Sequence, residues 1–206
     1  MKISQFFISL IFLATIVNAQ PQKVIGDCTL TFAITGGDAG TNDNLNGATK
    51  TLYVKGHETR VDINSTAYSQ SIIYDNVTGV AVILKEIGAN KFMSTLDALK
   101  WKEQNKKYEG MKISITSETK TILGYECKKA IASLKNGNSF IVFFASAIIP
   151  SAIENPFQFN DIPGFVLEYQ MPGEKGTKIN FSAVKINFSP VPASKFQIPN
   201  TGYRIL

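Results

Sequence analysis

The sequence predicts a mainly β fold (α+β) built on an antiparallel sheet. The chain is 44% hydrophobic and 11% aromatic, with 14 Phe and 7 Tyr, a composition that favours strands. Short segments of alternating apolar and polar residues also recur between turns rich in Gly, Asn and Pro. Regular spacing of such segments is typical of an antiparallel meander.

The first nineteen residues have the layout of a secretory signal peptide. Lys2 gives a positive start, an apolar run follows from Phe6 to Val17, and Ala19 ends a small-residue cleavage site. The run is too short to be a permanent membrane span. We therefore expect export to the periplasm or beyond, with 1–19 removed and 20–206 forming one β-rich domain. A retained N-terminal anchor is the alternative.

The first half of the chain predicts a series of strands. Cys28, Leu30, Phe32 and Ile34 alternate with Thr and Ala, so the apolar set should face the interior. A Gly- and Asn-rich loop follows at 36–47. Its alternating Asn residues imitate a calcium loop, but Tyr53 stands where the bidentate carboxylate belongs. The expected strands are 27–35, 50–56, 58–64, 71–75 and 80–86.

Residues 94–108 break this pattern and predict a helix with one side on the sheet. Ser94 and Asp97 form a weak capping box, and Leu96, Leu99 and Glu103 follow at helical spacing.

The second half returns to strands, at 111–117, 119–123, 125–134, 138–144, 164–171 and 177–189. The repeated Lys-Ile-Asn-Phe-Ser segments at 178–182 and 185–189 are seven residues apart, so their Phe residues cannot share one face of a regular strand. This predicts a bulge near Ala183 and Val184. The apolar segment 145–160 contains Pro150 and Pro156, so we expect a loop with a short helical turn that covers the sheet.

Two cysteines, Cys28 and Cys127, lie in predicted strands. In an exported chain an even count favours a disulfide between them. The alternative is two buried free thiols.

The sequence identifies no catalytic residue, cofactor or metal site. His57 is the single histidine, lies beside a predicted turn at Gly56, and lacks a partner at motif spacing. The net charge is +5, but it comes from scattered lysines, with Arg60 and Arg204 as the two arginines. A nucleic-acid partner is therefore not expected.

Three segments resemble uncharacterised exported bacterial proteins similar to the GLPGLI family. They are TKTILGYECKKA at 119–130, DIPGFVLE at 161–168, and FQIPNTGY at 196–203. Asp161 stands in place of the first Gly of the family signature, and Phe143-Phe144 in place of its Trp-Tyr pair. The resemblance implies a plan like that of the Lol lipoprotein carriers (LolA and LolB): a curved antiparallel sheet, or half-barrel, with one or two helices covering the concave face. It implies no catalytic residues.

The predicted function is a non-catalytic extracytoplasmic binding protein for an apolar ligand such as a lipid or an acylated protein. Its pocket should lie between the concave face and the segments 94–108 and 145–160, with Phe143, Phe144, Ile149 and Phe157 as lining. The alternative is a structural or protein-interaction module of the cell envelope. The sequence does not predict an oligomeric state.

Overall fold

The structure is a computed structural model that describes residues 22–36, 47–66, 68–172 and 177–206. The predicted leader and most of the 36–47 loop lie outside the described residues. The described part is mainly β, and the predicted fold class is confirmed.

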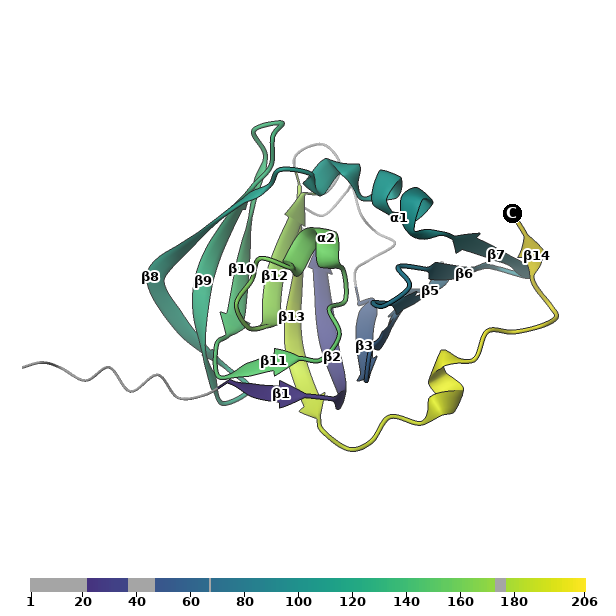
Figure 1. The fold of residues 1–206 in the computed structure, drawn as a ribbon, viewed down its shortest axis with the longest axis horizontal. Helices are drawn as coiled ribbons and strands as arrows, with labels where there is room; N and C mark the ends of the chain where they lie inside the picture. Colours follow the sequence, from purple (N-terminus) through teal and green to yellow (C-terminus); the bar gives the residue numbers. More distant parts are fainter. Residues whose placement is uncertain (1–21, 37–46, 67, 173–176) are drawn as a thin grey trace, which may run out of the picture.

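One open, curved sheet of 12 strands dominates the described part (Figure 1). Its strand order is β14-β7-β6-β5-β4-β3-β2-β13-β12-β10-β9-β8, and all neighbours are antiparallel except β14 and β7, which are parallel. The strands are β2 (Asp27–Gly36), β3 (Thr49–Lys55), β4 (Glu58–Asn64), β5 (Ser69–Asp75), β6 (Ala81–Ile87), β7 (Asn90–Leu96), β8 (Lys112–Ile122), β9 (Tyr125–Ser133), β10 (Ser139–Ala145), β12 (Phe165–Pro172), β13 (Lys178–Asn187) and β14 (Arg204–Ile205).

The alternation predicted for β2 is confirmed. Cys28, Leu30, Phe32 and Ile34 are all at most 2% exposed, whereas Thr29 and Thr31 are partly exposed. Successive side chains of a strand point to opposite faces, so the sequence pattern alone selects the buried face. This face contributes to the main hydrophobic core.

The predicted bulge is present in β13, where the register with β2 shifts between Ala183 and Lys185. The two echoed Phe residues nevertheless lie in different environments: Phe181 is buried on β13, whereas Phe188, just beyond the end of the strand, is exposed. The two strands predicted at 111–117 and 119–123 form one long strand, β8, whose register with β9 shifts between Ile115 and Thr119.

The helix predicted over 94–108 begins later than expected. Residues up to Leu96 belong to β7, and α1 spans Ala98–Gln104, followed by a 3-10 turn, η1 (Lys106–Tyr108). The N-cap is Asp97, whose carboxylate accepts a hydrogen bond from the Lys100 N–H at 2.8 Å. Ser94 is instead paired with Ile83 in the sheet.

Segment 145–160 covers the sheet as predicted, but it is more regular than a loop. It contains β11 (Ile148–Pro150) and a one-turn helix, α2 (Pro156–Phe159). β11 pairs in parallel with β1 (Lys23–Ile25) in a separate two-stranded sheet. Pro150 ends the strand, where its missing N–H is tolerated. The proline-rich C-terminal tail contains a 3-10 turn, η3 (Ala193–Phe196), before β14.

Both cysteines are buried free thiols, so the predicted disulfide is not formed in the structure. Cys28 lies on β2 and Cys127 on β9, with β13, β12 and β10 between them in the sheet. Four inter-strand steps span roughly 19 Å along the sheet surface. A disulfide needs Cα atoms within about 7 Å. Both cysteines do lie on strands, as predicted, but strand order places them apart.

Candidate functional site

A cleft of about 390 Å³ lies between the sheet and the segments that cover it. Side chains of β3 to β6, β12 and β13 form its floor and walls, and α1, η1 and residues 154–158 form its roof. This is the region between the sheet and the two covering segments where the sequence placed a pocket. Its size is within the range of small-molecule binding sites.

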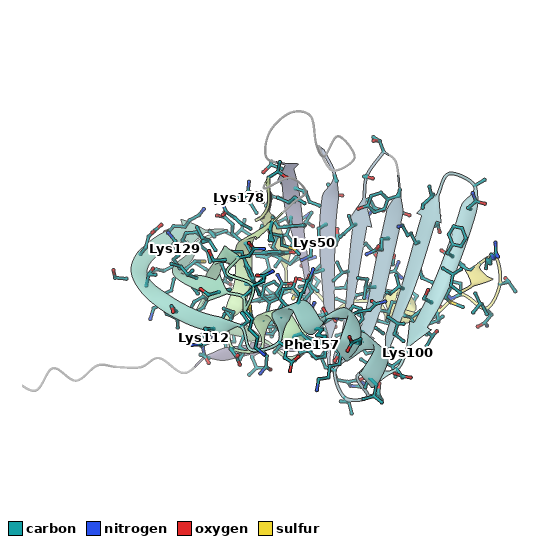
Figure 2. The ribbon with its side chains drawn as sticks, turned by 90° about the horizontal axis from the view of Figure 1, so that it is seen from above. Lys50, Lys100, Lys112, Lys129, Phe157 and Lys178 are labelled. Atoms are coloured by element: carbon teal, nitrogen blue, oxygen red, sulfur yellow. The ribbon has the colours of Figure 1, made fainter. Side chains whose placement is uncertain are left out.

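A buried lysine lies at the floor of the cleft. Lys50 is 1% exposed and lies on the inward face of β3, the same face as the buried residues Leu52 and Val54. In Figure 2 it lies deep among the side chains, whereas Phe157 and Lys100 lie on the covering segments. Lys50 is not among the candidate site residues that the sequence suggested. The sequence does carry a sign of it, because Lys50 is a charged residue at the same alternate positions of the strand as the apolar residues Leu52 and Val54.

Lys50 is held by one carboxylate and one phenol. Its Nζ donates to Glu154 Oε2 at 2.6 Å and to Tyr169 Oη at 2.8 Å. It also lies 4.5 Å from the ring centroid of Phe32 and 4.8 Å from that of Tyr169, so aromatic faces add to its stabilisation. Burial lowers the pKa of Lys50, and the adjacent Glu154 opposes that shift. Burial, with a further contribution from Glu154, raises the pKa of Tyr169 well above its usual value.

The covering segment is attached to the rest of the molecule at several points besides Glu154. Asn76 exchanges two hydrogen bonds with the backbone of Ile153, at 3.1 and 3.2 Å. The Asn155 amide donates to Asn105 Oδ1 at 2.8 Å, and the Ser151 hydroxyl donates to the Gly56 carbonyl at 2.6 Å. The roof of the cleft is therefore fixed to the β3–β4 and β5–β6 turns and to the C-terminal end of α1.

Two buried side-chain N–H donors, on residues that line the cleft, have no partner among the described residues. They are the indole Nε1 of Trp101, on α1, and the amide Nε2 of Gln158, on α2. Their residues are 6% and 5% exposed. Leaving a buried donor unsatisfied costs about 1–3 kcal/mol. Both N–H groups are themselves shielded from solvent, so they lie behind the surface of the cleft.

The four residues predicted as lining lie elsewhere. Phe144 is fully buried in the core. Phe143 is on β10, with the Lys120 ammonium 4.8 Å from its ring centroid. Ile149 lines a separate apolar cavity of about 60 Å³, and Phe157 lines an outer groove beside α1 and η1. Continuous apolar runs predicted burial correctly, but they could not distinguish core from cleft.

Other candidate chemistry lies outside the cleft. His57 is exposed in the turn between β3 and β4, and its Nε2 is 3.8 Å from Asp75 Oδ1. Within the described ranges, no group of three His, Cys, Asp or Glu side chains is arranged to hold a metal ion. No helix among the described residues has the length and apolar character needed to span a membrane.

The family model for the N-glycanase peptide, N-terminal domain, matches residues 48–189, and the chain belongs to this family. The match does not test the resemblance to the GLPGLI family. No curated protein matches the chain.

Several solved structures are similar in fold at low sequence identity. A structure of PNGF-II has a TM-score of 0.49 and 15% identity, over 87% of this chain and 30% of that one. The Pseudomonas aeruginosa MucA/MucB complex contains a chain with a TM-score of 0.47 and 12% identity, over 84% and 56%. A LolA superfamily protein from Nitrosomonas europaea has a TM-score of 0.36 and 10% identity, over 87% and 92%. This chain therefore spans about 30% of the length of PNGF-II.

Proposed function

We propose that this member of the N-glycanase peptide N-terminal domain family is a non-catalytic binding module whose ligand occupies the concave cleft. The observation that carries the proposal is the cleft itself, a space of about 390 Å³ with apolar strand residues on its floor and mainly polar side chains on its roof. Ligand sites commonly combine a mostly apolar lining with a small number of placed polar groups.

The absence of catalysis is part of the proposal and rests on how the polar groups are used. The amine of Lys50 donates hydrogen bonds to the carboxylate of Glu154 and to the phenol of Tyr169. They join the sheet to its cover, which is a structural task. His57, the single histidine of the chain, is exposed in a turn away from the cleft.

The structure favours a partly polar ligand over the lipid or acylated protein that the sequence suggested. An acyl chain in this cleft would lie against the amides of the roof and the Lys50–Glu154 pair, and it would desolvate them without hydrogen bonds. The apolar cavity beside Ile149 offers only about 60 Å³, far below a typical ligand site.

The alternative, a protein-interaction module without a small ligand, would need an exposed binding edge. β8 is the last strand of the sheet and is the natural candidate. Its polar, lysine-bearing sequence and its irregular register are features that oppose the addition of another strand. We therefore rank the cleft above the edge.

We further propose that the protein acts outside the cytoplasm after removal of residues 1–19, and that 20–206 is a single domain. The sequence layout of the leader supports export. The domain proposal is supported by the continuous sheet that runs from β2 to β14.

Trp101 makes the proposed function directly testable, because it is the single tryptophan of the chain and lines the cleft. The purified protein would be titrated with pools of glycans, peptides and fatty acids while its emission is followed. We expect at least one pool to shift the emission saturably. Gln70→Phe, which fills the cleft from β5, should abolish the shift, and Val77→Phe, in an exposed turn, should not. No saturable response, or an unchanged response in Gln70→Phe, would overturn the proposal.

A further inference from the structure

The outer surface of the covering segments carries a feature that is distinct from the cleft. The outer groove beside α1 and η1 has a volume of about 380 Å³, and a hollow of about 290 Å³ adjoins it and shares Lys106 and Glu109 with it. We propose that this surface docks on the anionic surface of a lipid bilayer. Its basic and apolar side chains, called the docking face below, are Leu99, Lys102, Lys106, Lys107, Lys135 and Phe157.

One side of the helical cover builds most of the docking face. Leu99, Lys102 and Lys106 are three and four residues apart, so they lie on the same side of α1 and η1. Trp101 and Gln104 lie on another side of α1 and line the cleft. In Figure 1, α1 forms the margin of the molecule at this end. A flat surface can therefore approach the docking face without entering the cleft.

The β9–β10 turn adds a lysine that is remote in the sequence. A Cβ on Gly110 would lie 2.2 Å from Lys135 Cε and 2.9 Å from Lys135 Nζ, so the lysine side chain lies against the bare backbone of Gly110. Gly110 follows η1 and has a φ of 69°, a conformation that disfavours residues with a side chain. This close approach brings Lys135 onto the same hollow as Lys106 and Lys107.

The docking face carries an excess of positive charge. Its four lysines share the groove and the hollow with two acidic residues, Glu103 and Glu109. Glu103 accepts a hydrogen bond from Lys106 at 3.0 Å. In the part of the chain that the structure describes, the other three lysines of the face form no ion pair. Lysines in this state are attracted to the negative potential of an anionic membrane surface.

The apolar side chains of the docking face favour a bilayer over other anionic partners. Leu99 is 80% exposed, and Phe157, which is partly exposed, lines the same groove. At a bilayer interface such side chains leave water, while the neighbouring lysines keep their ammonium groups among the phosphates. A nucleic acid offers the phosphates without an apolar layer. The combination of exposed leucine and unpaired lysines therefore matches an anionic bilayer.

The test is co-sedimentation of the purified protein with vesicles of phosphatidylcholine alone, or of phosphatidylcholine mixed with phosphatidylglycerol, at low and at high salt. Lys102→Glu/Lys135→Glu reverses two charges of the docking face. Lys178→Glu/Lys185→Glu is the matched control, because it changes the net charge equally on β13, outside the docking face. Figure 2 shows Lys178 well away from Phe157.

The apolar contribution is tested by a second pair of variants. Leu99→Asp replaces the exposed leucine of the docking face. Val184→Asp is its control, because Val184 is also an exposed apolar residue, at 55%, and lies on β13. Circular dichroism would establish that each variant is folded, and the lipid and salt dependence of the wild type tests the proposal without any substitution.

We expect the wild type to bind the mixed vesicles at least tenfold more tightly than the neutral ones, and to bind them less tightly at high salt. Each lysine near an anionic surface contributes about fivefold to binding, so the double lysine reversal should weaken binding at least tenfold. Leu99→Asp should weaken it at least threefold more than Val184→Asp does, and the lysine control should change it less than twofold.

A wild type without preference for anionic vesicles would overturn the proposal, and so would equal effects of the two lysine variants. If the lysine reversal weakens binding but Leu99→Asp matches Val184→Asp, the face binds anions by charge alone and the assignment to a bilayer is wrong. The cleft proposal is tested separately by Trp101 emission, so a failure of vesicle binding leaves it standing.

Discussion

Lys50 and Glu154, 104 residues apart in the chain, form a buried ion pair that joins the sheet to its cover. Lys50 is 1% exposed, whereas the Glu154 side chain is 17% exposed. The charge of Lys50 therefore depends more on Glu154 for stabilisation than the charge of Glu154 depends on Lys50, because water can still solvate the carboxylate.

Removal of the carboxylate should destabilise the fold. In Glu154→Gln, Lys50 is left buried without a counter-ion, and breaking such a pair costs about 3–5 kcal/mol. We expect a loss at or below the lower end of this range, since Glu154 is partly solvated. Urea unfolding would measure it. The double variant Lys50→Met/Glu154→Leu is the control, and it should recover most of the stability, because it buries no charge. Equal stability of Glu154→Gln and wild type would contradict the role of the pair.

The cysteines should titrate as two free thiols. Burial raises the pKa of Cys28 to about 12 and that of Cys127 to about 11, so neither forms a reactive thiolate near neutral pH in the folded state. We expect negligible reaction with a thiol reagent in the native protein. In denaturant without a reductant, two thiols should react per chain. If no thiol reacts in denaturant, the two cysteines form the disulfide that the sequence predicted.

The pKa of Cys28 also predicts a pH dependence of stability. Its folded value of about 12 lies above the usual 9.0, so the folded state holds the proton more tightly than the unfolded state. The stabilisation is fully present below pH 9 and is lost as the pH rises toward 12, by at most about 1.4 kcal/mol per pH unit. Lys50 acts in the opposite direction, because its pKa is lowered on folding. The difference between wild type and Cys28→Ala isolates the thiol. Measured by urea unfolding at pH 8 and 10, it should shrink at the higher pH; a constant difference would contradict the assignment.

Gly164 should not tolerate a methyl group. A Cβ there would lie 2.4 Å from the Ala145 carbonyl oxygen and 2.8 Å from the Phe144 ring. Gly164→Ala would force the residues that lead into β12 away from β10, and such overpacking typically costs about 1–3 kcal/mol. Gly26→Ala is a matched control, since a Cβ at that position meets nothing within 4 Å. Thermal unfolding of the two variants would compare them. A Gly164→Ala midpoint equal to that of Gly26→Ala would argue against this close approach.

The sequence by itself determined the features that depend on local pattern. Alternation placed Leu30 and Phe32 in the core, because side chains of a strand must point to opposite faces. The seven-residue echo placed a bulge at Ala183, because an odd spacing cannot keep one face in a regular strand. The prolines of 145–160 predicted that this segment would stay outside the main sheet and cover it, because proline disrupts regular strand pairing.

Tertiary structure decided which distant residues meet. Strand order separated Cys28 from Cys127, although both lie on strands as predicted. It also brought Glu154 of the cover onto Lys50, and Trp101 and Gln158 onto one cleft. Phe143 and Phe144, which the sequence assigned to the ligand, are buried elsewhere. A linear pattern records the face on which a side chain lies. It does not record the partner across the sheet, because non-local pairing depends on the order and curvature of the whole sheet.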